Sequence, residues 1–99
     1  MSFVMTRPEM LAAAAGDLQA LGSVISASNG AAAAPISGVV PAAADEVSAL
    51  TAARFAAHAA MYQAVSAQAA AIHELFVATL GTSAGSYAAT EAANAVATR

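Results

Sequence analysis

Large apolar side chains recur every three or four positions in two stretches of the chain. In the first stretch, Leu11, Leu18, Leu21 and Ile25 lie close to a seven-residue spacing. In the second, residues 45–80, the apolar side chains fall on one arc of about 160° when drawn at 100° per residue. This arc holds Val47, Leu50, Phe55, Met61, Tyr62, Val65, Ile72, Leu75, Phe76 and Leu80. Both patterns predict amphipathic helices, and strand alternation is not sustained anywhere.

The first helix has recognisable start and stop signals. The run Thr6-Arg7-Pro8-Glu9 fits a capping box, with Thr6 as N-cap, Pro8 in the first turn and Glu9 at the third helical position. Proline and glycine cluster after residue 34 and mark the end of the helix. The sequence therefore predicts a first helix at about 7–36 and a loop at about 37–44.

The second helix has an acidic start. Asp45 is a suitable N-cap, and Glu46 places a second acid at the positive end of the helix. No glycine or proline follows until Gly81, so the predicted helix spans about 45–80 and ends at that glycine. The remaining residues, about 81–99, are small and polar and predict a frayed or short helical tail.

The expected fold is a single all-α domain, an antiparallel two-helix hairpin, over residues 1–99. The narrow stripe of the first helix cannot cover the wide apolar arc of the second. At this size a single core rarely supplies more than about 3–5 kcal/mol, and small scaffolds depend on disulfides, metals or oligomerisation. The sequence predicts that the hairpin completes a four-helix bundle with a partner chain. The alternative is a hairpin that folds on itself with alanine facing water.

Composition narrows the function. Alanine supplies 33 of 99 residues, only 9% are charged, and three arginines against six acids give a net charge of −3. Three basic residues are too few to form a basic patch, so nucleic acid is not an expected partner. Without cysteine there is no disulfide, thiolate metal site or cysteine nucleophile. Two uncharged stretches are interrupted by polar or helix-breaking residues, which argues against a membrane span, and the N-terminus does not resemble a cleavable signal peptide.

Motifs for chemistry are weak. Gly81-Thr82-Ser83-Ala84-Gly85 matches G-x-S-x-G, but both histidines precede the serine, whereas in that hydrolase architecture the histidine follows it. His58 and His73 are fifteen residues apart, about 22 Å along one helix, and cannot share a metal. We therefore expect no enzyme, no catalytic or metal-binding residue and no cofactor.

Two further polar features stand out, Arg54 and the pair Tyr87 and Glu91. Arg54 lies inside the apolar arc without charged neighbours three or four residues away. Either a carboxylate from another chain pairs with it, or its side chain reaches to solvent. Antiparallel pairing also predicts an intrachain contact between Glu9 and His73. At the end of the chain, Tyr87 and Glu91 are four residues apart and share one face if the segment is helical.

Together these features resemble the PE family of mycobacteria. The resemblance rests on Met1-Ser2-Phe3-Val4, on the Pro8-Glu9 pair, on the stretch from Val40 to Ser48, and on Tyr87 and Glu91, and it covers essentially all 99 residues. The run from Ser48 to His58 is similar to the branch associated with the fifth mycobacterial type VII secretion system. The match ends with the PE domain, so activities of longer members, such as an esterase domain, are not transferred.

The resemblance implies a non-enzymatic, secreted interaction module with a role in host interaction. It would form a heterodimer with a PPE protein and carry the type VII export signal, with Tyr87 and Glu91 at the signal positions and Pro8 and Glu9 as the family motif. Localisation would be secreted or at the cell surface or envelope, and membrane association is allowed but not required. The alternative is an envelope component of a PE–PPE pair that assists small-solute passage across the outer membrane. The expected interface comprises Leu11, Leu18, Leu21, Ile25, Val47, Leu50, Arg54, Phe55, Met61, Tyr62, Val65, Ile72, Phe76 and Leu80.

Overall fold

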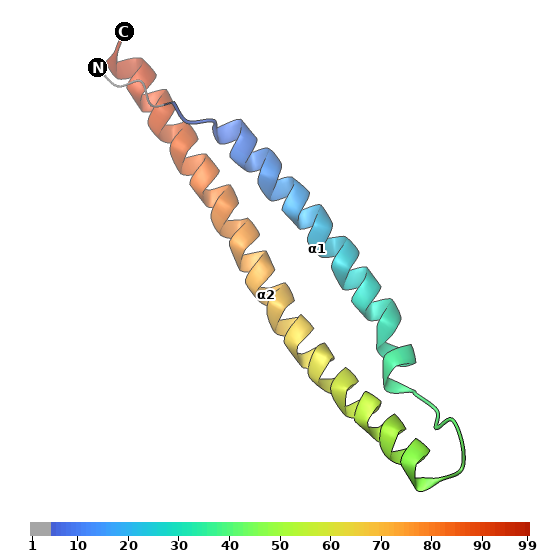
Figure 1. The fold of residues 1–99 in the computed structure, drawn as a ribbon. Helices are drawn as coiled ribbons and strands as arrows, with labels where there is room; N and C mark the ends of the chain where they lie inside the picture. Colours follow the sequence, from blue (N-terminus) through green and yellow to red (C-terminus); the bar gives the residue numbers. More distant parts are fainter. Residues whose placement is uncertain (1–4) are drawn as a thin grey trace. The chain divides into compact units, whose positions relative to one another are not determined.

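The computed structural model describes residues 5–99, which form two α-helices and no strand (Figure 1). Helix α1 spans Pro8–Ser37 and helix α2 spans Glu46–Ala97, with residues 38–45 between them. The predicted all-α fold with two helices is confirmed and is consistent with a helical hairpin. The segment Met1-Ser2-Phe3-Val4, which carries part of the family resemblance, lies outside the described residues.

Helix α1 begins one residue later than a Thr6 cap predicts. The carbonyl of Arg7 accepts the first two helical hydrogen bonds, from the backbone N–H groups of Met10 at 3.0 Å and Leu11 at 3.2 Å. Arg7 is therefore the N-cap, and Pro8 occupies the first helical position, where a missing N–H costs nothing. The capping-box assignment of Thr6 and Glu9 is wrong by one residue, because proline's fixed φ sets the start of the helix.

Helix α2 has the predicted cap. One carboxylate oxygen of Asp45 accepts a hydrogen bond from the Ser48 backbone N–H at 2.8 Å, and the other accepts one from the Ser48 hydroxyl at 3.1 Å. These bonds satisfy backbone donors that a helix start leaves unpaired. They also lower the pKa of the Asp45 carboxyl from its ordinary value of 3.8, because hydrogen bonds from the backbone and side chain of Ser48 stabilise its charged form.

The predicted end of the second helix at Gly81 is wrong. Helix α2 continues through Gly81 and Gly85 to Ala97, and no described glycine adopts a positive φ. A helical glycine costs about 1 kcal/mol relative to alanine, which the seven alanines after residue 81 can offset. The expected tail at 81–99 is therefore mostly regular helix, and its threonine hydroxyls bond to carbonyls one turn earlier, as Thr90 does to Ser86.

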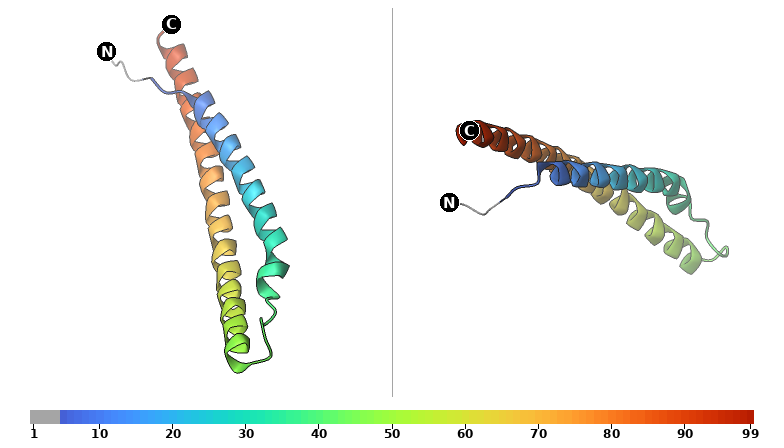
Figure 2. Two further views of the ribbon diagram at one scale, coloured as in Figure 1. Left: turned by 45° about the vertical axis from the view of Figure 1, so that its right-hand side comes forward. Right: turned by 90° about the horizontal axis from the view of Figure 1, so that it is seen from above.

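Contacts divide the chain into two compact units. The terminal unit comprises Met1–Gly22 with His73–Arg99, and the loop unit comprises Ser23–Ile72. In each unit a stretch of α1 lies beside a stretch of α2 that runs in the opposite direction (Figure 2).

Alanine forms the interior of both units. The buried side chains of the described residues are Ala15 and Ala84 in the terminal unit and Ala52 and Ala59 in the loop unit. No described polar or charged residue, and no large apolar one, is buried. The most deeply buried positions of each unit are therefore occupied by small side chains.

The pairing register differs from the predicted one. In the terminal unit, His73 Nε2 lies 2.6 Å from the carbonyl oxygen of Leu18, nine residues beyond Glu9, which we expected at this place. In the loop unit, the Tyr62 hydroxyl donates to Asn29 Oδ1 at 2.8 Å. Residues 38–45 lie outside both helices, and because non-helical chain can advance up to about 3.3 Å per residue against 1.5 Å in a helix, helix periodicity alone does not give the register.

Candidate interaction surface

The face of α2 that meets α1 follows a regular small-residue pattern. In the loop unit, the least exposed positions of α2 are spaced by four or three residues, and the two spacings alternate from Ala52 onward. They are Ser48, Ala52, Ala56, Ala59, Gln63, Ser66 and Ala70. This is the 3.5-residue repeat of helices that pair along a seam, built here largely from alanine and serine. We call these residues the inner face.

In the terminal unit, the face of α1 that meets α2 has a similar spacing of three and four residues. Its least exposed positions are Pro8, Leu11, Ala15, Leu18 and Gly22. Gly22 allows the closest approach, because a Cβ at this position would stand 2.7 Å from Cδ2 of His73. The imidazole therefore occupies the space that a side chain would fill, and its Nε2 must carry the proton, since the Leu18 carbonyl can only accept.

Large apolar side chains of the loop unit stay exposed. Phe55 is 58% exposed, Met61 is 68% exposed and Val65 is 62% exposed. On a helical wheel they fall on a different side of α2 from the inner face. We call the following residues the outer face of the loop unit: Val47, Leu50, Arg54, Phe55, Met61, Tyr62, Val65 and Ile72. Tyr62 lies at the edge of this face, because its hydroxyl also bonds to Asn29 of α1.

The terminal unit divides its predicted interface residues between two environments. Leu11, Leu18 and Leu80 are half-buried in the contact between α1 and α2. Leu21 and Phe76 are each 55% exposed, and Ile25, in the loop unit, is exposed to the same degree. Most of the predicted interface thus remains available to another chain, and three leucines also serve the hairpin itself.

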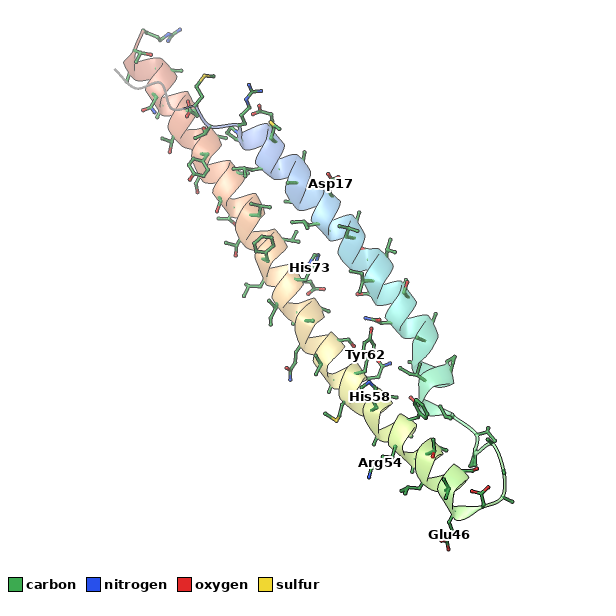
Figure 3. The ribbon with its side chains drawn as sticks, viewed as in Figure 1. Asp17, Glu46, Arg54, His58, Tyr62 and His73 are labelled. Atoms are coloured by element: carbon green, nitrogen blue, oxygen red, sulfur yellow. The ribbon has the colours of Figure 1, made fainter. Side chains whose placement is uncertain are left out.

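Arg54 lies in a shallow hollow on the outer face. Leu50, Thr51, Phe55 and His58 line this hollow with it, around a volume of about 450 Å³. Figure 3 labels Arg54, His58 and Tyr62 along this stretch of α2. Within the part of the chain that the structure describes, the Arg54 guanidinium makes no hydrogen bond or ion pair. A permanent cation therefore sits among exposed apolar side chains.

Tyr87 and Glu91 lie in regular helix, one turn apart on one side of α2. Tyr87 is 47% exposed. Glu91 accepts a hydrogen bond at 2.8 Å from the hydroxyl of Thr6. Thr6 and Glu91 both line an open hollow of about 740 Å³ in the terminal unit, together with Pro8, Glu9, Ala12, Gly81, Ala84, Gly85 and Ala88.

Sequence reasoning missed three polar residues of the contact between the helices. Thr6 and Asn29 each pair with a side chain of α2, and in the loop unit Gln63 Nε2 is buried without a hydrogen-bond partner in the described structure. The available signal was the 3.5-residue spacing, which places Asn29 and Gln63 on the contact faces. The wide apolar arc is the stronger periodic pattern of the second helix and obscures this spacing.

The serine motif has no catalytic geometry. Gly81 to Gly85 lies within the continuous helix α2, whereas a nucleophile elbow needs a sharp turn from strand to helix. Among residues 5–99, no group of three histidine, cysteine, aspartate or glutamate side chains is placed to hold a metal ion.

Both helices are long and apolar enough, by length and composition alone, to cross a membrane. The most apolar 18-residue window of α1 is 6% buried and that of α2 is 0% buried. Apolar core helices of soluble proteins and signal sequences meet the same criteria, but core helices are mostly buried, and these windows are exposed.

The fold and the exposed faces define a small all-α protein with an alanine interior and most of its large apolar side chains on the outside. The model of the PE family matches residues 4–94, and the chain belongs to this family, as its sequence motifs predict. It is 75% identical over 97 residues to "PE family protein PE13" of Mycobacterium tuberculosis, and the match covers 98% of each chain.

Longer relatives share the same region. "PE-PGRS family protein PE_PGRS33" of M. tuberculosis is 61% identical over 95 residues, which are 96% of this chain and 20% of that protein. "PE family protein PE8" is 55% identical over 94 residues, 95% of this chain and 34% of that protein. The chain thus spans a fifth to a third of these two relatives, and neither description names a reaction.

Proposed function

We propose that this chain is a non-enzymatic interaction module that pairs with a PPE protein in a four-helix bundle and carries a type VII export signal. The pair would act outside the cell or at its surface. The observation that carries the proposal is the position of the large apolar side chains: in the described structure most of them are exposed, while the side chains that are fully buried are alanines.

The energetics support a partner. Fully burying a large apolar side chain contributes about 1.5–3 kcal/mol relative to leaving it exposed. A pair of partner helices laid on the outer face would bury several such side chains at once. Obligate interfaces commonly reach about 2,000 Å² or more, which suits helices of 30 and 52 residues.

Arg54 supports a partner with an acidic group. A guanidinium inside a buried interface is destabilising unless a carboxylate pairs with it. The hollow around Arg54, with Leu50 and Phe55 beside it, would accept a partner carboxylate and shield the ion pair from water. We propose that this contact selects among PPE proteins by charge.

Co-expression tests the pairing. The chain would be purified alone and together with candidate PPE proteins, and both samples would be compared by light scattering and thermal unfolding. We expect the pair to form a 1:1 complex with a cooperative melting transition and the lone chain to aggregate or melt without cooperativity. A lone chain that is monomeric and melts cooperatively would overturn the proposal.

Export is tested separately in the native host. Tyr87→Ala and Glu91→Ala should each block appearance in the culture filtrate while partner binding persists, because both residues lie on the exposed last turns of α2. Asn94→Ala, also exposed on these turns, is the control and should be exported normally. Normal export of both test variants would show that the signal is elsewhere.

A second candidate function has its own observation. Because both helices are apolar and long enough to span a bilayer and their most apolar windows are almost wholly exposed, the pair would serve as an envelope component that assists small-solute passage. Flotation of the purified pair with liposomes distinguishes the two functions. Association with the vesicles favours the envelope role, and a pair that stays at the bottom of the gradient removes it.

A further inference from the structure

We propose that Thr6 is a positioning residue for the export signal, because its hydroxyl holds the Glu91 carboxylate against the start of the first helix. The inference rests on the proposed function of Tyr87 and Glu91. It changes what the signal is: a composite of both ends of the chain rather than a linear C-terminal motif.

The helix that carries the signal has little else to hold it. In the terminal unit, Ala84 is the last buried residue of α2, and every residue from 85 to 99 is exposed. An unpacked helical segment of this length is marginal in water, and its end frays. Tyr87 and Glu91 would then lose their fixed relative geometry for part of the time.

The Thr6–Glu91 hydrogen bond ties this segment down. Among residues 5–99, it is the hydrogen bond that links positions 85–97 of α2 to the chain outside α2. The bond is 2.8 Å long, and its carboxylate acceptor makes it a charge-assisted hydrogen bond. Because the partners are 85 residues apart in sequence, the bond exists only when the two ends of the chain pair.

Local structure makes Thr6 a firm anchor. Arg7 precedes a proline and is therefore restricted to extended backbone conformations, and its carbonyl caps α1. The backbone of Arg7, the residue directly after Thr6, is thereby restricted at the start of α1. Threonine adds a stiff, β-branched side chain with few χ1 choices. Because Arg7 and not Thr6 caps the helix, the Thr6 hydroxyl is free to serve Glu91.

The geometry also explains how both signal residues are presented. With Glu91 held by Thr6, one turn of helix fixes Tyr87 on the same side of α2, where its ring stays 47% exposed. A receptor would then meet a phenol and a carboxylate at a constant separation. Without the hydrogen bond, it would first have to order the segment and pay the entropy of doing so.

The matched variants are Thr6→Val and Thr6→Ser. Valine keeps the β-branched shape without the hydroxyl, and serine keeps the hydroxyl without the methyl group. Each variant would be made in the full chain in the native host, with co-purification of the partner as the check on folding. Export would be measured in culture filtrate, and amide hydrogen exchange of residues 88–97 would be measured on the purified complex.

We expect Thr6→Val to bind its partner normally, to lower export and to speed exchange at 88–97 by roughly threefold to tenfold, the size expected for a charge-assisted hydrogen bond at an exposed site. Thr6→Ser should behave like the unaltered chain in both measurements. Equal losses in the valine and serine variants would overturn the inference, because the methyl group and not the hydroxyl would then be responsible.

Glu91→Ala separates this inference from the proposed function. If Glu91→Ala blocks export while Thr6→Val exports and exchanges like the unaltered chain, the positioning role of Thr6 is wrong and the signal assignment stands. If Glu91→Ala is exported normally, the signal assignment itself is wrong. Faster exchange at 88–97 in Thr6→Val would still establish the anchoring contact in that second case.

Discussion

The two faces of α2 in the loop unit use apolar residues in opposite ways. The inner face meets α1 through small side chains, and Ala59 is only 3% exposed. The outer face carries Phe55 and Met61, which are 58% and 68% exposed. In an ordinary monomer the larger residues would form the interior. The difference leaves the strongest hydrophobic contacts of the loop unit unmade within the chain, as the proposed pairing requires.

The largest expected effect comes from the exposed side. Phe76→Ala should lower the stability of the complex by about 3–5 kcal/mol, the range for removing a phenylalanine side chain from a fully buried site. Thermal or chemical unfolding of the purified pair measures it. Glu74→Ala, on another side of α2, is the control. A melting temperature that does not move would place Phe76 outside the interface.

A substitution on the inner face should act on the hairpin itself. Ala59→Leu inserts three carbon atoms where α1 and α2 meet and should cost about 1–3 kcal/mol through overpacking. Ala60→Leu adds the same atoms at an exposed neighbouring position and should leave stability nearly unchanged. The two variants would be compared by unfolding in the same complex. Equal effects of the two would contradict the close contact at Ala59.

Two glycines of α1 sharpen the contrast between contact and open surface. At Gly16 an added Cβ meets nothing within 4 Å, whereas at Gly22 it stands 2.7 Å from the His73 ring. Gly16→Ala should therefore stabilise by about 0.5–1 kcal/mol through helix propensity. The free energy of unfolding of Gly22→Ala should be about 1–2 kcal/mol lower than that of Gly16→Ala, because the displaced His73 loses its bond to Leu18.

Melting temperatures of the two alanine variants test this order. The ring proton resonances of His73 provide a second readout, since they should shift in Gly22→Ala and stay unchanged in Gly16→Ala. Stabilisation by both substitutions would show that the helices do not approach closely at Gly22.

Acidification tests the start of α2 without touching either face. The pKa of Asp45 is lowered in the folded chain by its bonds from Ser48, so its contribution to stability is present above the ordinary pKa of 3.8. That contribution is lost as the pH falls through the lower, folded value. We expect the smallest effect here. Asp45→Asn should flatten the dependence of stability on pH in this range, and helicity measured by circular dichroism would follow it. An unchanged acid profile would contradict the cap.

Local signals in the sequence predicted the two helices well and their ends less well. Proline at the first helical position fixed the start of α1 to within a residue, and the carboxylate of Asp45 marked the start of α2 correctly. Gly81 misled because a single glycine costs only about 1 kcal/mol. The alanines that follow it, from Ala84 onward, continue the helix.

The contact between the helices was harder to predict, for a physical reason. Hydrophobic periodicity follows the largest side chains, and in this chain they mark the outward sides. The inner face consists largely of alanine and serine. Both residues also occur at exposed positions, so they do not distinguish buried from exposed positions in the sequence. The register depended on the path of the non-helical residues 38–45, which helix periodicity does not describe. The family, by contrast, followed from a few dispersed motifs and is confirmed.

An alanine seam has a further consequence for alignment. Alanine loses almost no rotamer entropy when it is buried, so the helices can come together at little cost. On the inner face of the loop unit, positions seven residues apart are mostly alanine or serine, so side-chain shape there distinguishes poorly between one register and a register shifted by one repeat. One polar contact in each unit, Tyr62 with Asn29 and His73 with the carbonyl of Leu18, therefore selects the register in which the two helices pair.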